Sequence, residues 1–192
     1  MAAKSSQMLP LGTPAPTFSL PDTGGTVHSL DDAPGSQAYL VMFICNHCPF
    51  VIHVADELAR LANDYQAKDV AVFAINSNDA GQYPADGPET MRQVSARHGY
   101  TFPYLIDAEQ DVAKAYHAAC TPDFYLFNSD RLLVYRGQMD GSRPGNSVPV
   151  DSRDIRRAID AVLAGEPVAE DQVPSIGCSI KWIAGNEPVS TS

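Results

Sequence analysis

The chain has 192 residues, of which 44% are hydrophobic and 19% charged, and this composition suits one well-packed globular domain. The formal net charge of -10 argues against a nucleic-acid or anionic-membrane partner, because both select basic patches. The longest apolar run, residues 38–45, is far shorter than the roughly 20 residues that span a bilayer, and residues 1–16 lack the apolar segment of a signal peptide. We therefore expect a soluble, cytoplasmic protein.

The N-terminal part of the chain predicts an arm, a hairpin and a strand–helix–strand unit. Residues 1–17 are rich in Pro and Ser and predict an arm, and residues 18–30 hold two short alternating segments around a Gly-Gly turn, which predict a hairpin. Residues 38–44 are continuously apolar, as in a strand covered on both faces, and residues 69–76 predict a second buried strand. From Pro49, apolar residues recur at helical spacing. We expect Val51, Val54, Ala55, Leu58, Ala62 and Tyr65 on the buried face, with Asp56, Glu57 and Arg60 elsewhere.

The remaining elements complete an α/β domain. A loop over 77–88 leads to a helix that Pro88 opens and Gly99 closes. Further along we expect a strand over 100–107, a helix over 108–117, a hairpin over 123–138 and a helix over 152–165. This order predicts one domain over 18–165, with a central mixed β-sheet flanked by helices. The bulky Ile176, Ile180 and Trp182 predict that the tail, residues 166–192, docks on this domain.

The chemistry of the chain is concentrated in its cysteines. Four cysteines are too few for a secreted disulfide scaffold, so in a reducing compartment they are catalytic, metal-binding or simply buried. Cys45 and Cys48 form a close pair where a buried strand meets a helix, and such a CxxC pair is a redox signature. The unpaired N–H groups and the positive dipole end of the helix favour a thiolate there. The pair therefore predicts a reactive thiolate beside a thiol that closes a disulfide.

Other interpretations of the pair stay open at this point. Zinc sites normally need a second cysteine pair at similar spacing, which Cys120 and Cys178 do not supply. Soft thiolates beside His47 would also suit copper delivery, or a metal-binding or thiol-sensing module without turnover. We expect no metal and no cofactor.

Several segments resemble the thioredoxin fold and its redoxin, or AhpC/TSA, branch. The motif "CNHCP" after an apolar strand and the segment "CTPDFYLF" over 120–127 are similar to the thioredoxin fold, in which a cis-proline lies opposite the CxxC. Pro122 after Thr121 matches that position. The segments "GTPAPTFSLPDTGG" and "VYRGQMD" are typical of the redoxin branch, which shares its fold with peroxiredoxins. The resemblance covers roughly residues 12–165 and implies a thioredoxin fold and a redox function.

The resemblance implies one of two assignments. In a thioredoxin-like dithiol, Cys45 attacks a substrate disulfide and Cys48 resolves the mixed disulfide. In a peroxiredoxin-like antioxidant peroxidase, Cys48 or Cys45 attacks a hydroperoxide; with Cys48 as the attacking thiol, Cys45 stands where such enzymes carry a Thr hydroxyl. That departure disfavours the peroxidase, and we predict a thiol–disulfide oxidoreductase. We expect its site to be shaped by Asn46, His47, Pro49, Thr121 and Pro122.

This function implies its partners. We expect a protein or small-molecule disulfide, or a hydroperoxide, as substrate and an external thiol as electron donor. Cys120 lies two residues before Pro122, and a docked tail could bring Cys178 to it. The sequence therefore raises the hypothesis of a second redox pair, Cys120 with Cys178, against the alternative that both are inert buried thiols.

Overall fold

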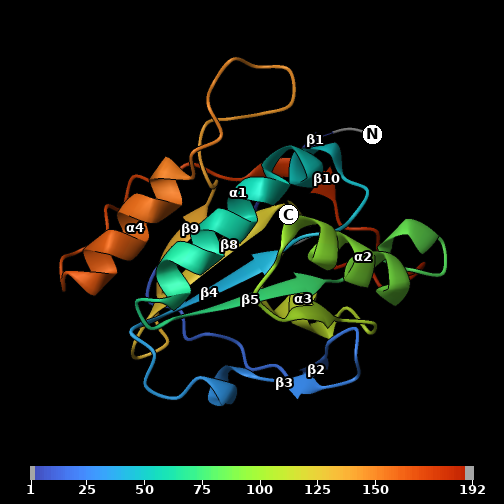
Figure 1. Cartoon of the computed structure of the whole chain (residues 1–192), viewed down its shortest axis with the longest axis horizontal. Coiled ribbons are helices and arrows are strands. Elements are labelled where there is room, and N and C mark those ends of the chain that lie inside the picture. The colour runs from blue at the N-terminus through green and yellow to red at the C-terminus, as the bar shows by residue number, and fades with distance from the viewer. Residues whose placement is uncertain (1–2, 189–192) are drawn as a thin grey trace.

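A five-stranded mixed sheet forms the centre of the molecule in a computed structural model that describes residues 3–188 (Figure 1). Its strands, in spatial order, are β6 (Tyr104–Ile106), β5 (Val70–Asn76), β4 (Ala38–Phe43), β8 (Asp123–Asn128) and β9 (Leu133–Gly137). β4, β5 and β6 run parallel, whereas β8 is antiparallel to both β4 and β9. Because β4 is the middle strand and is covered on both faces, all six of its side chains are buried. The predicted mixed sheet is confirmed.

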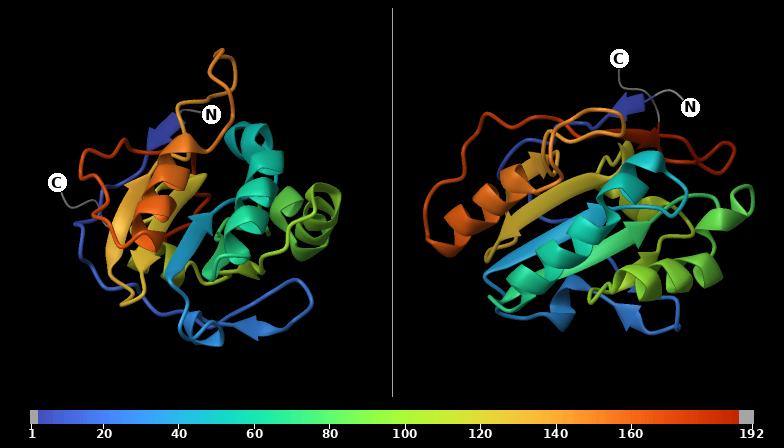
Figure 2. Two further views of the ribbon diagram at one scale, coloured as in Figure 1. Left: turned by 60° about the vertical axis from the view of Figure 1, so that its left-hand side comes forward. Right: turned by 45° about the horizontal axis from the view of Figure 1, so that its top comes forward.

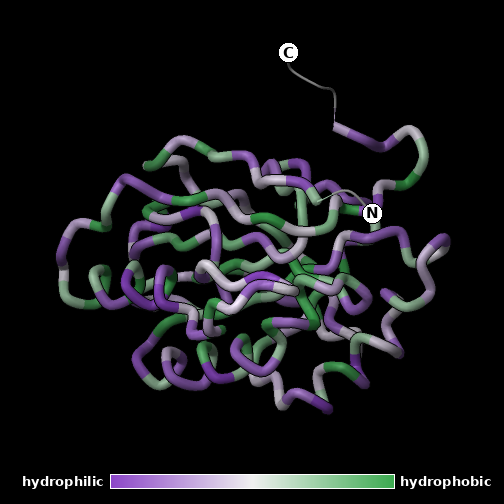
Figure 3. Tube along the Cα trace, turned by 90° about the horizontal axis from the view of Figure 1, so that it is seen from above, coloured by the Kyte–Doolittle hydropathy of each residue, from purple (hydrophilic) through white to green (hydrophobic). Residues whose placement is uncertain are grey.

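Two layers cover the sheet, one on each face. β4 packs against both layers because its side chains alternate between the two faces. Leu40 and Met42 pack with α1 (Pro49–Gln66), α2 (Pro88–His98) and α4 (Arg153–Leu163), and α1 and α4 lie on one face of the sheet (Figure 2). Tyr39 and Val41 pack in the other layer with α3 (Asp111–Ala115). Hydrophobic segments accordingly concentrate in the interior (Figure 3). No helix within residues 3–188 combines the length and apolar character needed to cross a membrane.

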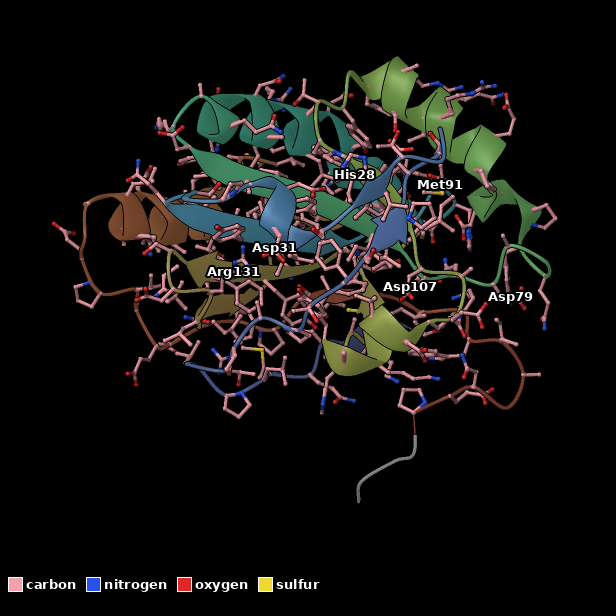
Figure 4. All side chains as sticks on the ribbon, turned by 90° about the horizontal axis from the view of Figure 1, so that it is seen from below. His28, Asp31, Asp79, Met91, Asp107 and Arg131 are labelled. Carbon is pink, nitrogen blue, oxygen red and sulfur yellow. The ribbon has the colours of Figure 1, made fainter. Side chains whose placement is uncertain are left out.

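The N-terminal hairpin closes the α3 side of the molecule. β2 (Leu20–Pro21) pairs antiparallel with β3 (Val27–His28), as predicted, and the 3-10 helix η1 (Leu30–Asp32) follows. Arg131, in the turn between β8 and β9, donates a hydrogen bond to Asp31 at 2.6 Å (Figure 4). This contact ties the hairpin segment to the central sheet.

The predicted helices and strands are present, with shorter bounds in the second half. α2 begins at Pro88 and ends where Gly99 takes φ +68°, as expected for a left-handed cap. The loop before it contains the 3-10 helix η2 (Pro84–Asp86). The strand expected over 100–107 shrinks to β6 because Pro103 has no N–H to pair. The helix expected over 108–117 shrinks to α3, since Gln110 before it has a positive φ of 62°.

Glu57 departs from the predicted pattern. The spacing places it off the buried face of α1, but the side chain is buried under α4. Its carboxylate accepts hydrogen bonds from Ser152 Oγ at 2.5 Å, Arg156 Nη2 at 3.0 Å and Arg60 Nε at 2.7 Å. Burial raises the pKa of Glu57 and these donors lower it, with a net lowering. A charge can therefore lie beneath α4 because it is paired.

The two ends of the chain form a second small sheet that lies over the start of α1. β10 (Ile176–Ser179) pairs antiparallel with β1 (Ala3–Ser5) on one side and with β7 (Cys120–Thr121) on the other. Cys178 lies opposite Ala3 and Thr121, and Ser179 lies opposite Cys120. Within the tail, β10 therefore lies against β7 of the domain, with Ile180 buried and Ile176 exposed. The arm predicted over residues 1–17 also carries a paired strand, which alternation could not reveal in three exposed residues.

Gly177 makes the closest approach in this small sheet. A Cβ at this position would lie 2.0 Å from the carbonyl oxygen of Thr121 and 2.6 Å from its carbon, which leaves space only for glycine. We therefore expect Gly177→Ala to destabilise the fold by roughly 1–3 kcal/mol, as overpacking does, and to release β10. Urea unfolding and limited proteolysis of the tail measure the two effects.

Gly141→Ala is the matched control, because its added Cβ meets only Val148 Cγ1 at 3.6 Å, an ordinary contact. Equal stability and equal protease resistance of the two variants would show that β10 does not hold Thr121 as closely as described.

Candidate active site

Cys45 and Cys48 lie at the turn between β4 and α1, as the sequence predicts. Cys45 follows the buried end of β4, and Cys48 is the N-cap residue of α1, with Pro49 as its first residue. Both are free thiols, 2% and 0% exposed. Pro49 needs no N–H partner in the first helical turn, so the turn fits the helix without an unpaired donor.

The loop before β8 faces this pair. The Thr121–Pro122 peptide bond is cis, and Thr121 contacts both sulfurs. Its Oγ1 lies 3.2 Å from Cys45 Sγ, and its carbonyl oxygen accepts a hydrogen bond from the Cys48 thiol at 3.2 Å. The predicted positions of Thr121 and Pro122 opposite the CxxC are therefore confirmed.

The surroundings of the two sulfurs favour a negative charge on Cys48. A hydrogen bond from Cys45 lowers the pKa of Cys48 to about 5 against the opposing effect of burial, and further hydrogen bonds from Cys178 and from the Val51 N–H add to it. The pKa of Cys45 is raised well above its usual value, first by the same hydrogen bond and then by burial and by Asp86. Cys48 at the start of α1 is therefore the more acidic of the two thiols, and it gives up the hydrogen bond to the Thr121 carbonyl oxygen when it ionises. The sequence prediction gives the attacking role to Cys45, and the order of attack stays a prediction.

Asn46 and His47, between the cysteines, are held by Asp86 of η2. Asp86 Oδ1 accepts the Asn46 N–H at 2.8 Å, and Oδ2 lies 2.7 Å from His47 Nδ1. Tyr104 Oη donates to Asn46 Oδ1 at 3.0 Å. The His47 ring stacks on Tyr83 with the two planes 4° apart. The turn is thus fixed by polar contacts on the side away from Thr121.

Sequence reasoning did not single out Asp86. It is 2% exposed and also accepts a hydrogen bond from Asn78 Nδ2 at 2.7 Å. In the sequence it is one of several acidic residues in a loop rich in Gly, Pro and Asp, so no local signal distinguishes it. Its importance follows from the path of the loop, which returns to the CxxC turn some 40 residues later in the chain.

A metal ion would find three ligands here. Cys45, His47 and Asp86 each offer a ligand atom, and the three atoms lie within 4.8 Å of one another. It is the only such group among residues 3–188. A thiolate, an imidazole and a carboxylate form a set that zinc or copper accepts, with a position left open. The alternative of a metal-binding module therefore has a defined place in the structure.

The strand register does not favour the hypothesis of a second redox pair, Cys120 with Cys178, which stays a prediction. In the ladder between β7 and β10, Cys178 is opposite Thr121 and Cys120 is opposite Ser179. Neighbouring residues of a strand point to opposite faces, so the two thiols lie on different sides of the ladder. Cys178 shares the side of Thr121 and the buried cluster of Cys48, and its proximity lowers the pKa of Cys48 while that of Cys178 is raised. Docking of the tail thus brings Cys178 to the CxxC.

Asp123, directly after Pro122, is a second residue that the sequence does not reveal. It is fully buried, and burial raises its pKa to about 7 although Tyr125 Oη and the Phe124 N–H donate to it. Its charge contributes, after burial, to raising the pKa of Cys120. Cys120 thus has surroundings that keep it a thiol, unlike Cys48.

A dithiol at a strand-to-helix turn, opposite a cis-proline and on a mixed sheet covered by helices, defines a thioredoxin-fold redox protein. A thiol:disulfide interchange protein of the thioredoxin family from Chlorobium tepidum shares this fold, with 16% identity and a TM-score of 0.62 over 81% of this chain and 99% of that one. The family model described as Redoxin matches residues 10–153. The chain belongs to the redoxin family.

Two relatives extend this comparison. An uncharacterized conserved protein from Geobacillus kaustophilus is 59% identical, and its crystal structure matches with a TM-score of 0.93 over 95% of this chain and 97% of that one. Thiol-disulfide oxidoreductase ResA of Geobacillus thermodenitrificans is 27% identical over 122 residues, 62% of this chain. The match spans 64% of the length of ResA, just under two thirds of it.

The charge on Cys48 can be tested through its hydrogen bond from Cys45. We expect Cys45→Ala to raise the pKa of Cys48, because the variant removes the donor that lowers it most. At pH 6 the alkylation rate of Cys48 in the reduced protein should fall about tenfold or more, since the thiolate is the reacting form. Alkylation across a pH series, with mass spectrometry to locate the modified cysteine, measures this.

Cys45→Ser is the matched control, because its hydroxyl can donate in place of the thiol and should keep most of the effect. If the pH dependence of Cys48 alkylation is the same in Cys45→Ala as in the wild type, another group stabilises the thiolate.

Proposed function

We propose that the chain is a thiol–disulfide oxidoreductase whose Cys45 and Cys48 alternate between dithiol and disulfide. The observation that carries this proposal is the arrangement at Thr121, where each of two buried sulfurs lies 3.2 Å from an oxygen of one residue. The surroundings lower the pKa of Cys48 and raise that of Cys45. Such a pair has a nucleophile and a resolving thiol in place. The similarity to ResA supports the same chemistry.

In the direction of reduction, the Cys48 thiolate attacks one sulfur of a substrate disulfide. The substrate S–S bond breaks, a mixed disulfide forms at Cys48, and the other substrate sulfur leaves as a thiolate. Cys48 then no longer holds the Cys45 proton in a hydrogen bond, and the His47–Asp86 pair lies beside Cys45 to receive it. Cys45 attacks Cys48 Sγ, the Cys45–Cys48 disulfide forms, and the second substrate sulfur leaves. An external thiol restores the dithiol by the same exchange.

We expect a substrate to approach the sulfurs beside Pro122. A small hollow borders Pro122 and is lined by Phe50 of α1, Ile176 of β10 and Arg143 of the loop before α4. Both cysteines are almost completely buried, so a substrate disulfide must open this contact between α1 and β10. A peptide segment with an apolar side chain next to its disulfide suits this entrance.

A cytoplasmic location stays a prediction.

The proposed activity is tested by comparing the rate of insulin reduction with the rate of hydroperoxide consumption. We expect the protein to accelerate insulin reduction by a small dithiol, and Cys48→Ser to lower the rate at least 100-fold, because the substituted hydroxyl is a far weaker nucleophile. The wild-type protein should consume hydroperoxide no faster than the Cys48→Ser variant does. Both rates are measured on the reduced wild type and on Cys120→Ser, a control whose thiol lies away from the pair.

The two assignments of attack are separated by trapping the mixed disulfide with a substrate peptide. With Cys178 also changed to Ser, Cys45→Ser should trap the peptide on Cys48, whereas Cys48→Ser should not react. Trapping on Cys45 instead would restore the roles predicted from the sequence. Rapid hydroperoxide consumption without insulin reduction would replace the proposal by a peroxiredoxin-like peroxidase.

A further inference from the structure

Cys178 is the one cysteine outside the CxxC that reaches it. β10 sets Cys178 opposite Thr121, whose side chain contacts Cys45 Sγ at 3.2 Å. Because residues paired in a ladder direct their side chains to the same face, Cys178 points toward the active-site sulfurs. It is 5% exposed and belongs to the same buried cluster as Cys45 and Cys48.

The fit of β10 at this place is close. The carbonyl oxygen of Thr121 lies 3.2 Å from Cys48 Sγ. The same oxygen is so close to Gly177 that a Cβ added there would lie only 2.0 Å from it. One backbone atom thus touches the residue before Cys178 and the sulfur of Cys48. β1 holds the other edge of β10, with Ala3 opposite Cys178. The position of Cys178 beside Cys48 is therefore fixed from both sides.

We propose that Cys178 is a second resolving thiol for Cys48. The proposal rests on the thiol–disulfide exchange proposed above and adds a residue to it. When a substrate is bound to Cys48 as a mixed disulfide, Cys178 loses its proton and its sulfur attacks Cys48 Sγ. A Cys48–Cys178 bond forms, the bond between Cys48 and the substrate breaks, and the substrate sulfur leaves with the electron pair and takes up the proton. No further oxidant or reductant is needed.

The same reaction connects the two disulfides of the site. Starting from a Cys45–Cys48 disulfide, attack of Cys178 on Cys48 Sγ gives a Cys48–Cys178 disulfide and frees Cys45 as a thiol. The oxidation state is unchanged and the bond moves from one partner to the other. Cys48 is thus shared by two partners, Cys45 from the turn and Cys178 from the tail.

The charges around Cys178 explain when it reacts. Burial, followed by the hydrogen bond and charge of Cys48, raises the pKa of Cys178 to about 12, so Cys178 stays protonated beside a Cys48 thiolate. Once Cys48 is in a disulfide, it has no charge to oppose the ionisation of Cys178. Cys178 therefore becomes a nucleophile once Cys48 is part of a disulfide, either with a substrate or with Cys45.

The experiment uses variants that leave Cys48 with one possible partner. Cys45→Ser with Cys120→Ser keeps Cys48 and Cys178, and Cys45→Ser with Cys178→Ser keeps Cys48 and Cys120. Each reduced variant is treated with an aromatic disulfide that releases a coloured thiolate. We expect the first variant to release two equivalents and to end two hydrogens lighter with no adduct, because Cys178 resolves. The second should retain the reagent on Cys48.

Intact mass and peptide mapping distinguish the outcomes. A stable adduct on Cys48 in the first variant, or adducts on Cys48 and Cys178 together, would overturn the role of Cys178. A Cys48–Cys120 disulfide in the second variant would contradict the assignment of Cys120 and Cys178 to different sides of the ladder between β7 and β10. Either result leaves the proposed function intact if the wild type still forms a Cys45–Cys48 disulfide and reduces insulin. Urea unfolding of both variants confirms that they are folded.

Discussion

The contacts of Thr121 hold the active site together. Its hydroxyl meets Cys45, its carbonyl oxygen meets Cys48, and its backbone pairs with β10 at Cys178. Pro122 directly follows Thr121 and joins β7 to β8, the neighbour of β4 in the central sheet. The two ends of the strand-to-helix turn and the tail are therefore positioned by one residue, and a shift of Thr121 would move three sulfurs at once.

Burial sets the chemistry of these sulfurs. A thiolate without water needs donors, and Cys48 obtains them from the thiol of Cys45, from Cys178 and from the first turn of α1. The negative charge of Asp86 on the far side of the turn opposes a second thiolate on Cys45. The two neighbouring sulfurs thus differ in acidity, and the difference between them comes from their surroundings.

The sequence predicts the local features well. The CxxC turn, the buried face of α1, the ends of α2 and the loop of Thr121 and Pro122 each depend on a few adjacent residues with strong conformational preferences. β1, β7 and β10 could not be predicted, because they have only two to four residues and gain their stability from partners far along the chain. The same limit hid Asp86, and the burial of Glu57 depends on Arg156 of another helix. The register of Cys120 and Cys178 could not be predicted for the same reason, since it is a property of the ladder between β7 and β10.

The position of Cys45 decides between redox exchange and metal binding. Cys45 is a partner of Cys48 on one side and a member of the group with His47 and Asp86 on the other. A metal ion on that group would need Cys45 as a thiolate, whereas the reduced dithiol keeps Cys45 protonated so that it can stabilise Cys48. Asp86 is already occupied by the Asn46 N–H and by Asn78, and His47 is stacked on Tyr83. These contacts orient the turn. Metal binding and disulfide exchange thus make opposite demands on Cys45, because a metal ion needs its thiolate, whereas exchange needs a thiol whose proton can leave at the right step.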